Sequence, residues 1–373
     1  MRVSIDAPQL ARGVATVSRS VPARTTMPVL TGMLLEADPA GVRLVATDLE
    51  VTCTVTIAAE VQEPGRAVVP ARLFAEIVRR VPSPRLDIVA DPERADALLS
   101  WERSEFRLHG FGPDQFPQPA AAPAGTDFTT FSEGGLRDTL RHTAFAAATE
   151  AGGRPILTGV ELTLLDGDYR AVATDGMRVA YFRTAERTDW SQGTAVTLPG
   201  RGVDEIVRTI EAAGGQGAFC AHDNHMFLRA GPTEVAVRLL EGRFPAILDL
   251  VPKQFPTTVR LNAGELRDAC ERVALVTDAP DRLHAITVVA SGEGIEVRAR
   301  SPEVGEAREA VPAAVDGPDI EFPVNARMVM EGLRHLGDGE LDIEFSGPQS
   351  LARMRRADDP RLQYMQMPLR LGS

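Results

Sequence analysis

The sequence has almost no lysine, little cysteine and no long apolar stretch. Lys253 is the single lysine among 40 lysines and arginines, and it stands in a proline-flanked segment without a glycine-rich loop. This context excludes a phosphate-binding P-loop and argues against a Schiff-base lysine. No apolar run approaches the roughly 20 residues that cross a bilayer. The sequence also lacks the Gly-x-Ser-x-Gly and cysteine–histidine patterns of nucleophilic enzymes.

The composition is that of a globular protein with two or three domains. Of the 373 residues, 44% are hydrophobic and 25% are charged, which is typical of globular proteins, and the length suits more than one domain. Cys53, Cys220 and Cys270 are odd in number and are not paired by spacing. We therefore expect buried thiols in a reducing compartment, the cytoplasm.

One cluster resembles a metal site. Cys220 is followed by His222 and His225, but a zinc site would require a fourth ligand in a tetrahedral cage. The intervening Asp223 and Asn224 suit the turn of a β-hairpin. We therefore expect a hairpin with both histidines at its tip, and neither a metal nor a cofactor. A metal-dependent enzyme that uses this cluster is the least favoured alternative.

Three parts of the chain repeat one pattern. Pro-Val-Leu-Thr-Gly at 28–32 precedes an alternating apolar stretch and Ala-Thr-Asp at 46–48, and Pro-Ile-Leu-Thr-Gly at 155–159 precedes Ala-Thr-Asp at 173–175 in the same way. A weaker copy runs over 281–301. The copies are farther apart than the units of a solenoid, which recur every ~20–50 residues. They indicate three whole domains, expected at 1–125, 126–252 and 253–373.

Each repeat contains two helical patterns among alternating strand patterns. In the first repeat, 29–36 and 42–46 have the pattern of a strand pair, and further strands are expected near 86–89, 97–101 and 106–108. The fold class is therefore α+β, with an antiparallel sheet and two helices in each domain. The expected helices cover 10–21 and 69–81 in the first repeat, 136–150 and a segment opening at 198–201 in the second, and 266–278 and a segment from 322 to 336 in the third.

No catalytic constellation is found. Asp48 and Asp175 occupy equivalent places in their repeats, so they should lie in separate domains as turn or cap residues rather than as paired catalytic carboxylates. We expect a protein that is not an enzyme.

The charges are unevenly distributed. The formal net charge is −12, which argues against a surface that coats nucleic acid uniformly. Every predicted helix nevertheless carries at least two arginines, a pattern that fits a shared basic surface and six separately solvated helix faces about equally well. Arginines facing inward in an acidic protein could hold duplex DNA through its phosphates without reading sequence. The residues are Arg12, Arg19, Arg72, Arg79, Arg80, Arg137, Arg141, Arg201, Arg208, Arg267, Arg272, Arg327 and Arg334.

Several motifs stand in order along the chain, in segments 24–30, 46–50, 69–72, 241–245 and 367–371 and in Ala173-Thr174-Asp175-Gly176-Met177-Arg178. In these motifs the chain resembles the beta subunit of bacterial DNA polymerase III, the sliding clamp family, along essentially its whole length. The resemblance implies three clamp domains in each subunit, a head-to-tail ring dimer and helices that line the hole. It also implies a processivity factor that encircles duplex DNA and is not itself catalytic.

The resemblance further implies a peptide-binding cleft between the second and third domains. Its partners in the family are the DNA polymerase III catalytic subunit, the clamp loader and other proteins with a clamp-binding motif. Apolar and sulfur-bearing side chains suit an adaptable groove. The matching residues are Arg154, Ile156, Leu157, Thr174, Gly176, Met177, Arg178, Val179, Pro245, Leu250, Asn325, Met328, Met365, Met367, Pro368, Leu369 and Arg370.

Two more surfaces follow from this architecture. We expect phosphate contacts from Arg24, Arg72, Arg79, Arg137, Arg141, Arg201 and Arg208. At the subunit interface, Phe106 and Leu108 should expose one apolar strand face to Leu275 and Val276 of the second copy. Arg94 and Arg103 should pair with Glu303 and Glu306 across the same interface.

Some residues depart from the family pattern. Pro323 lies in the opening of the last predicted helical segment, where many relatives read Phe-Asn. Gln366 stands where relatives usually carry an aliphatic residue, and Met177 stands where histidine or a bulkier residue is common. These departures suggest an alternative, a paralogous clamp whose cleft resists a clamp-directed antibiotic. Such peptide antibiotics would then be further cleft ligands.

Overall fold

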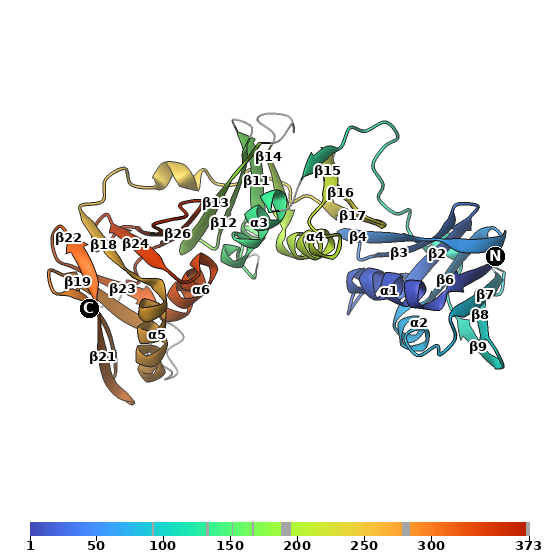
Figure 1. Ribbon diagram of the computed structural model, residues 1–373, viewed down its shortest axis with the longest axis horizontal. Coiled ribbons are helices and arrows are strands. Elements are labelled where there is room, and N and C mark those ends of the chain that lie inside the picture. The colour runs from blue at the N-terminus through green and yellow to red at the C-terminus, as the bar shows by residue number, and fades with distance from the viewer. Residues whose placement is uncertain are drawn as a thin grey trace. The chain divides into compact units, whose positions relative to one another are not determined.

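The computed structural model describes residues 1–91, 93–131, 134–150, 152–165, 168–187, 195–277 and 284–370. The chain forms two compact units. Unit 1 comprises Met1–Glu133 with Asp204–Leu239, and unit 2 comprises Gly134–Val203 with Leu240–Ser373. Figure 1 shows the helices and strands of both. In the part of the chain that the structure describes, no helix is both long and apolar enough to cross a membrane.

Unit 1 is built on two antiparallel sheets. One has the order β5-β1-β7-β8-β9 and the other β10-β15-β16-β17-β4-β3-β2-β6, and helices α1 and α2 lie side by side (Figure 1). The strands are β1 (Arg2–Asp6), β2 (Gly32–Asp38), β3 (Gly41–Thr47), β4 (Val51–Ile57), β5 (Ala59–Glu63), β6 (Gly65–Pro70), β7 (Arg85–Asp91), β8 (Asp96–Trp101), β9 (Ser104–His109), β10 (Thr129–Phe131), β15 (Gly217–His222), β16 (His225–Ala230) and β17 (Thr233–Arg238). The helices are α1 (Ala7–Val17) and α2 (Ala71–Val78), and the division between the units falls inside α4 (Gly200–Ala212).

Unit 2 also contains two antiparallel sheets. Their orders are β14-β11-β12-β13-β26-β25-β24-β18-β22 and β21-β20-β19-β23. The strands are β11 (Gly159–Leu165), β12 (Asp168–Thr174), β13 (Arg178–Arg187), β14 (Ala195–Pro199), β18 (Thr257–Asn262), β19 (Ala285–Ser291), β20 (Gly294–Ser301), β21 (Gly305–Val311), β22 (Ala313–Asp316), β23 (Ile320–Asn325), β24 (Glu340–Phe345), β25 (Ala352–Arg356) and β26 (Leu362–Gln366). The helices are α3 (Gly135–Arg141), α5 (Ala263–Ala274) and α6 (Ala326–Leu336).

The second and third repeats share one sheet in unit 2. Strand β13 of the second repeat pairs with β26 of the third, with Arg178 opposite Gln366 and Val179 opposite Met365. Helix α6 then packs closely on β26, because Gly332 has no side chain there. A Cβ at Gly332 would lie 2.4 Å from the ring of the fully buried Tyr364. This close packing fixes β26 and the segment that follows it.

The repeated turns have the same geometry in both repeats. The Asp48 carboxylate accepts hydrogen bonds from the amides of residues 50 and 51, and the Asp175 carboxylate accepts them from residues 177 and 178. One residue in each turn has a positive φ: Leu49 at 76° in the first repeat and Gly176 at 92° in the second. The expectation that both aspartates are turn residues is confirmed, and a left-handed residue is what such a turn requires.

The predicted helix over 136–150 is wrong in its length. Helix α3 ends at Arg141, and a short 3₁₀ turn, Ala144–Ala146, follows. The hydroxyls of Thr139 and Thr143 donate to the carbonyls of Gly135 and Thr139, a local bond that competes with helix continuation. Helix α1 is also shorter than predicted and passes into a 3₁₀ turn, Ser18–Ser20. Residues 278–283, which include the start of the weak third copy, lie outside the described residues.

The Cys220 cluster forms the expected hairpin. Strands β15 and β16 pair His222 with His225, and Asp223 adopts φ 50° in the turn between them. Cys220 is buried, whereas His222 is exposed. Among the described residues, no group of three or more potential ligands could hold a metal ion.

Candidate functional site

An apolar cluster in unit 2 underlies the residues assigned to the cleft. Leu157, Val172, Val179, Phe244 and Met365 are buried together. They come from a 3₁₀ turn (Pro155–Thr158), from β12, β13 and β26, and from the segment before a second 3₁₀ turn (Ile247–Leu250). Because β13 and β26 are neighbouring strands, the sheet holds this cluster in a fixed arrangement.

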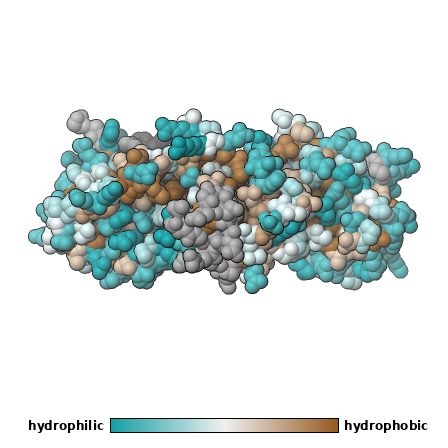
Figure 2. Space-filling model, turned by 90° about the horizontal axis from the view of Figure 1, so that it is seen from above, coloured by the Kyte–Doolittle hydropathy of each residue, from teal (hydrophilic) through white to brown (hydrophobic). Residues whose placement is uncertain are grey.

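Four large apolar side chains lie exposed in the same segments and define what we call the apolar surface. Leu250 is 79% exposed, Leu248 39%, Met367 38% and Met177 37%. The amide of Met367 donates to the carbonyl of Met177 at 2.8 Å, so the two methionines are held beside each other. Hydrophobic side chains reach the surface among hydrophilic ones in Figure 2. Exposed apolar groups held on rigid backbone are a feature of binding sites.

The predicted cleft residues fall into three classes of exposure, all within unit 2. Exposed residues can contact a ligand directly, and half-buried residues can contact it with the atoms that remain accessible. Buried residues only support the surface from below. The exposed ones are Arg154, Gly176, Met177, Leu250, Met367 and Arg370; the half-buried ones are Ile156, Pro245, Asn325, Met328, Pro368 and Leu369; the buried ones are Leu157, Thr174, Arg178, Val179 and Met365.

Arg178, which the resemblance places in the cleft, could have bonded a peptide from there, but the structure engages its side chain within unit 2. Its guanidinium does not face a ligand: Nε donates to Asp175 at 2.9 Å, one terminal nitrogen donates to Glu331 at 2.5 Å, and the other donates to the Phe145 carbonyl at 2.8 Å. Burial opposes the charged form, but the hydrogen bond to Glu331 and the nearby charges outweigh it and raise the pKa of Arg178. Arg178 is therefore a buried tie beneath the surface rather than a donor to a peptide.

Gln366 and Asn325 also have structural roles. Gln366 is 1% exposed, and its amide contacts the Tyr364 hydroxyl at 3.3 Å and the Asn325 carbonyl at 3.4 Å. The departure from the family pattern at Gln366 therefore lies beneath the surface, because its side chain is enclosed. Asn325 caps α6 by accepting the amide of Met328 at 3.1 Å.

Two histidines lie near Phe145, the residue whose carbonyl accepts a hydrogen bond from Arg178. His335 stacks on Phe145 at 3.9 Å and lies edge-on to His142 at 6.4 Å. Burial, reinforced by His142, lowers the pKa of His335 to about 4, and burial likewise lowers the pKa of His142. Both rings are thus packed in their neutral form at neutral pH.

This burial predicts acid sensitivity. The ordinary pKa of histidine, 6.5, lies above the folded value of His335, about 4, so the unfolded state binds more protons in that window and stability is lost as pH falls through it. Allowing for solvent screening, we expect His335 to lower the free energy of unfolding by about 1–2 kcal/mol between pH 7 and pH 4.5. Urea titrations of wild type and His335→Phe at both pH values measure this; the variant should lose less stability, and His222→Phe should behave as wild type. Equal losses in wild type and His335→Phe would contradict the prediction.

Five of the arginines assigned to DNA contact lie on helices, whereas Arg79 follows the end of α2 as its C-cap and Arg24 lies in a loop. Arg137 is half-buried and pairs with Asp138 at 2.9 Å, and Arg79 pairs with Glu76 at 3.0 Å. Arg19, one of the helical arginines, is tied to the buried Glu205 at 2.6 Å. The exposed ones are Arg24, Arg72, Arg79, Arg141, Arg201 and Arg208.

The residues assigned to the subunit interface are partly corrected. Phe106 is 43% exposed and stacks on Trp101, and Leu275 is 67% exposed. Leu108, however, is 3% exposed, so the expected two-residue apolar face on β9 is wrong: the strand points Leu108 into its own core. Val276 is half-buried against the core of unit 2.

The charged residues assigned to the subunit interface are exposed. Arg94 pairs with Asp91 at 3.4 Å within its own unit, and Arg103, Glu303 and Glu306 are exposed. Leu73, 50% exposed, and Val304, 57% exposed, were not singled out in the sequence. Only the structure shows that these two apolar side chains are left in solvent.

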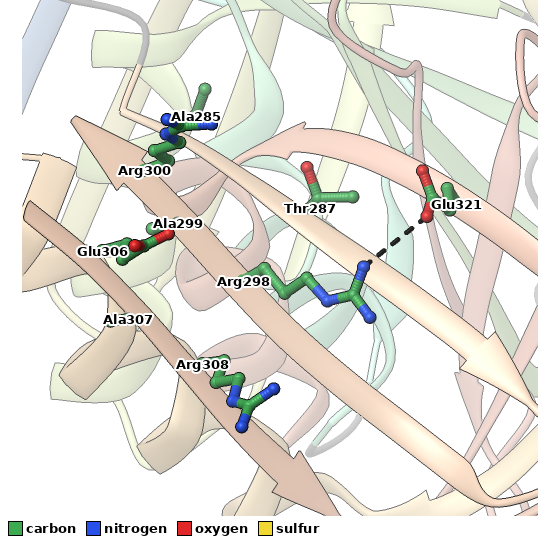
Figure 3. Close-up of a pocket in the computed structure, with 9 residues that line it drawn as sticks. All are labelled: Ala285, Thr287, Arg298, Ala299, Arg300, Glu306, Ala307, Arg308 and Glu321. Atoms are coloured by element: carbon green, nitrogen blue, oxygen red, sulfur yellow. Dashed lines mark ion pairs between the residues drawn. The ribbon is translucent and has the colours of Figure 1, made fainter. Parts of the chain in front are cut away.

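A pocket of about 840 Å³ lies on the four-stranded sheet of unit 2. Figure 3 shows Arg298 reaching toward Glu321, an ion pair of 3.6 Å, with Arg300, Arg308 and Glu306 nearby. Arg298 stands opposite Arg308, and Arg300 opposite Glu306, on the paired strands β20 and β21, so charges of both signs line this sheet face.

Comparisons with known proteins agree along the chain. Family models match residues 1–120, 130–246 and 249–370 as the N-terminal, central and C-terminal domains of the DNA polymerase III beta subunit. The chain is 29% identical to the beta sliding clamp of Synechococcus elongatus over 98% of each protein. It is 27% identical to that of Staphylococcus epidermidis over 94% of each.

Solved structures show the same likeness. The DNA polymerase III subunit beta of Pseudomonas aeruginosa matches with a TM-score of 0.93 and 27% identity over 100% of both chains. A sliding clamp from the same organism bound to griselimycin matches with a TM-score of 0.90 and 27% identity over the same share. None of these relatives is described as a resistance protein or a metal-dependent enzyme, so both alternatives are without support. The fold is the three-domain clamp fold, and the chain belongs to the DNA polymerase III beta subunit family, the beta sliding clamps.

Proposed function

We propose that this protein is a replicative DNA sliding clamp of the cytoplasm, a non-catalytic processivity factor. The observation that carries the proposal is the full-length match of all three clamp domains. The clamp would close as a head-to-tail dimer, with unit 1 of one copy against unit 2 of the other. Strands β9 and β21 are each the edge strand of their sheet, and a free edge can accept a strand of another chain. Head-to-tail contacts that close by rotation give rings.

The apolar surface of unit 2 is the proposed docking site for partners. Short peptides with hydrophobic residues near one end, of the kind carried by the polymerase III catalytic subunit, the clamp loader and other clamp-binding proteins, would cover Met177, Leu250 and Met367. The buried cluster of Leu157 and Val179 would support them from below. A clamp among the structural relatives binds griselimycin, so we propose that this ligand, and peptide antibiotics directed at clamps, compete for the same surface.

The proposed DNA contacts are electrostatic. Exposed arginines on α2, α3 and α4 would meet phosphates without reading bases. Because the net charge is −12, binding to an open duplex should be weak, and because the contacts are made with phosphates, it should fall steeply with salt. Retention on DNA would then depend on the closed ring rather than on affinity.

Retention on circular DNA tests this function. The clamp is loaded on a nicked circular plasmid by a clamp loader, freed of loader by gel filtration at 0.5 M salt, and followed over time. We expect the protein to stay on the circle and to leave within minutes of linearisation, because only an end lets a ring slide off. The Leu275→Asp variant, which should not close, is the control. Rapid loss of the wild-type protein from intact circles would exclude the sliding-ring function.

A further inference from the structure

We infer that Glu331 of α6 is a positioning residue for the apolar surface: through Arg178 it fixes the turn that presents Met177 and Met367. The inference rests on the proposed peptide-binding function. Glu331 would not touch the peptide, because it acts through the buried guanidinium of Arg178, to which it is bonded at 2.5 Å.

Arg178 can transmit a change at Glu331 to the turn that presents Met177. Its amide is held by the Asp175 carboxylate at 3.0 Å, and its carbonyl accepts the Thr174 hydroxyl at 2.6 Å. The preceding residue, Met177, offers its carbonyl to the amide of Met367. A displacement of Arg178 therefore moves the turn from 175 to 177, and with it the start of the C-terminal segment.

Glu331 supplies an anchor that Asp175 alone does not. One oxygen of Asp175 is engaged by two amides and the other by Nε of Arg178, and all of these groups belong to the same turn. Glu331 comes from the third repeat, and the Phe145 carbonyl comes from the segment after α3 in the second. The Arg178 side chain thus joins three separate elements beneath the apolar surface.

The exposures of the two partners suit a positioning role. The Arg178 side chain is 9% exposed, whereas that of Glu331 is 42% exposed. Replacing Glu331 therefore opens no cavity in the core, but it leaves a buried cation with one carboxylate fewer. A partner left unsatisfied in a buried site costs more than a surface ion pair contributes. The guanidinium should shift toward Asp175 or solvent and release the turn.

The experiment uses the full-length dimer and a fluorescein-labelled peptide with hydrophobic residues near its C-terminal end. Fluorescence anisotropy gives the Kd, and hydrogen exchange followed by mass spectrometry gives the protection of 174–179. We expect Glu331→Gln to raise the Kd roughly tenfold, the factor that corresponds to about 1.4 kcal/mol, with faster exchange confined to 174–179 and 365–369. Glu331→Asp, which keeps the charge, should give an intermediate Kd.

Glu271→Gln is the matched control. Glu271 lies on α5 and pairs with Arg334 of α6 at 2.9 Å, and the two side chains are 44% and 58% exposed. The substitution removes this ion pair and should leave the Kd unchanged. A wild-type protein that does not bind the peptide would overturn the proposed function itself. Wild-type binding with an unchanged Kd in Glu331→Gln would overturn only this inference. Faster exchange throughout α5 and β24 in Glu331→Gln would also overturn it, because Glu331 would then stabilise the unit as a whole.

Discussion

Replacing Leu275 by aspartate is expected to convert the dimer into monomers at micromolar concentration. Leu275 is 67% exposed, so the substitution does not disturb the core of its own subunit. In the closed ring the new carboxylate would be transferred into an apolar contact at both interfaces, and each transfer costs several kcal/mol. A loss of about 3 kcal/mol raises a dissociation constant more than ~100-fold. Multi-angle light scattering across a concentration series measures the change.

The control for this experiment is Leu250→Asp, which introduces the same charge at another exposed leucine of unit 2. It should remain a dimer, because Leu250 belongs to the apolar surface and not to the proposed interface. A monomeric wild type, or two variants that dissociate equally, would contradict the placement of the interface. The exposed Leu73 and Val304 offer further positions for the same test, since both are apolar and in solvent in the single subunit.

The repeats of the sequence predicted the fold well because they record local geometry. Thr47-Asp48 and Thr174-Asp175 occupy the same position within the first and second repeats. In the structure both pairs form the same hydrogen-bonded turn. A turn of this kind depends on a few adjacent residues, so a motif in the sequence is enough to place it. The α+β class and the Cys220–His225 hairpin followed from equally local signals.

The roles of single side chains were less predictable because they depend on tertiary partners. Alternation on β9 suggested that Phe106 and Leu108 share an exposed face, but only packing decides that Leu108 is enclosed. Arg178 matched a cleft motif, but its side chain is hydrogen-bonded to Glu331, which lies 153 positions away in the sequence. Gln366 differed from the family pattern, yet its side chain is buried beside Tyr364. No periodicity in the sequence reveals such contacts.

The largest effect on partner binding is expected from Leu250→Asp. Leu250 is the most exposed large apolar side chain among the described residues, at 79%. Packing within the isolated subunit therefore does not explain why this residue is apolar. A bound peptide would cover it, and a carboxylate at this position would lose its hydration without a partner.

We expect the peptide Kd, micromolar in the wild type at about −8 kcal/mol, to rise at least ~30-fold in Leu250→Asp. Met367→Ala, which only shortens a side chain that is 38% exposed, should weaken binding less. His222→Ala, at the hairpin tip of unit 1, should leave binding unchanged, and Leu275→Asp should bind the peptide as a monomer with nearly wild-type affinity, because peptide docking and ring closure use different surfaces of unit 2. If Leu250→Asp and His222→Ala affect the Kd equally, the peptide binds elsewhere and the assignment of the apolar surface is wrong.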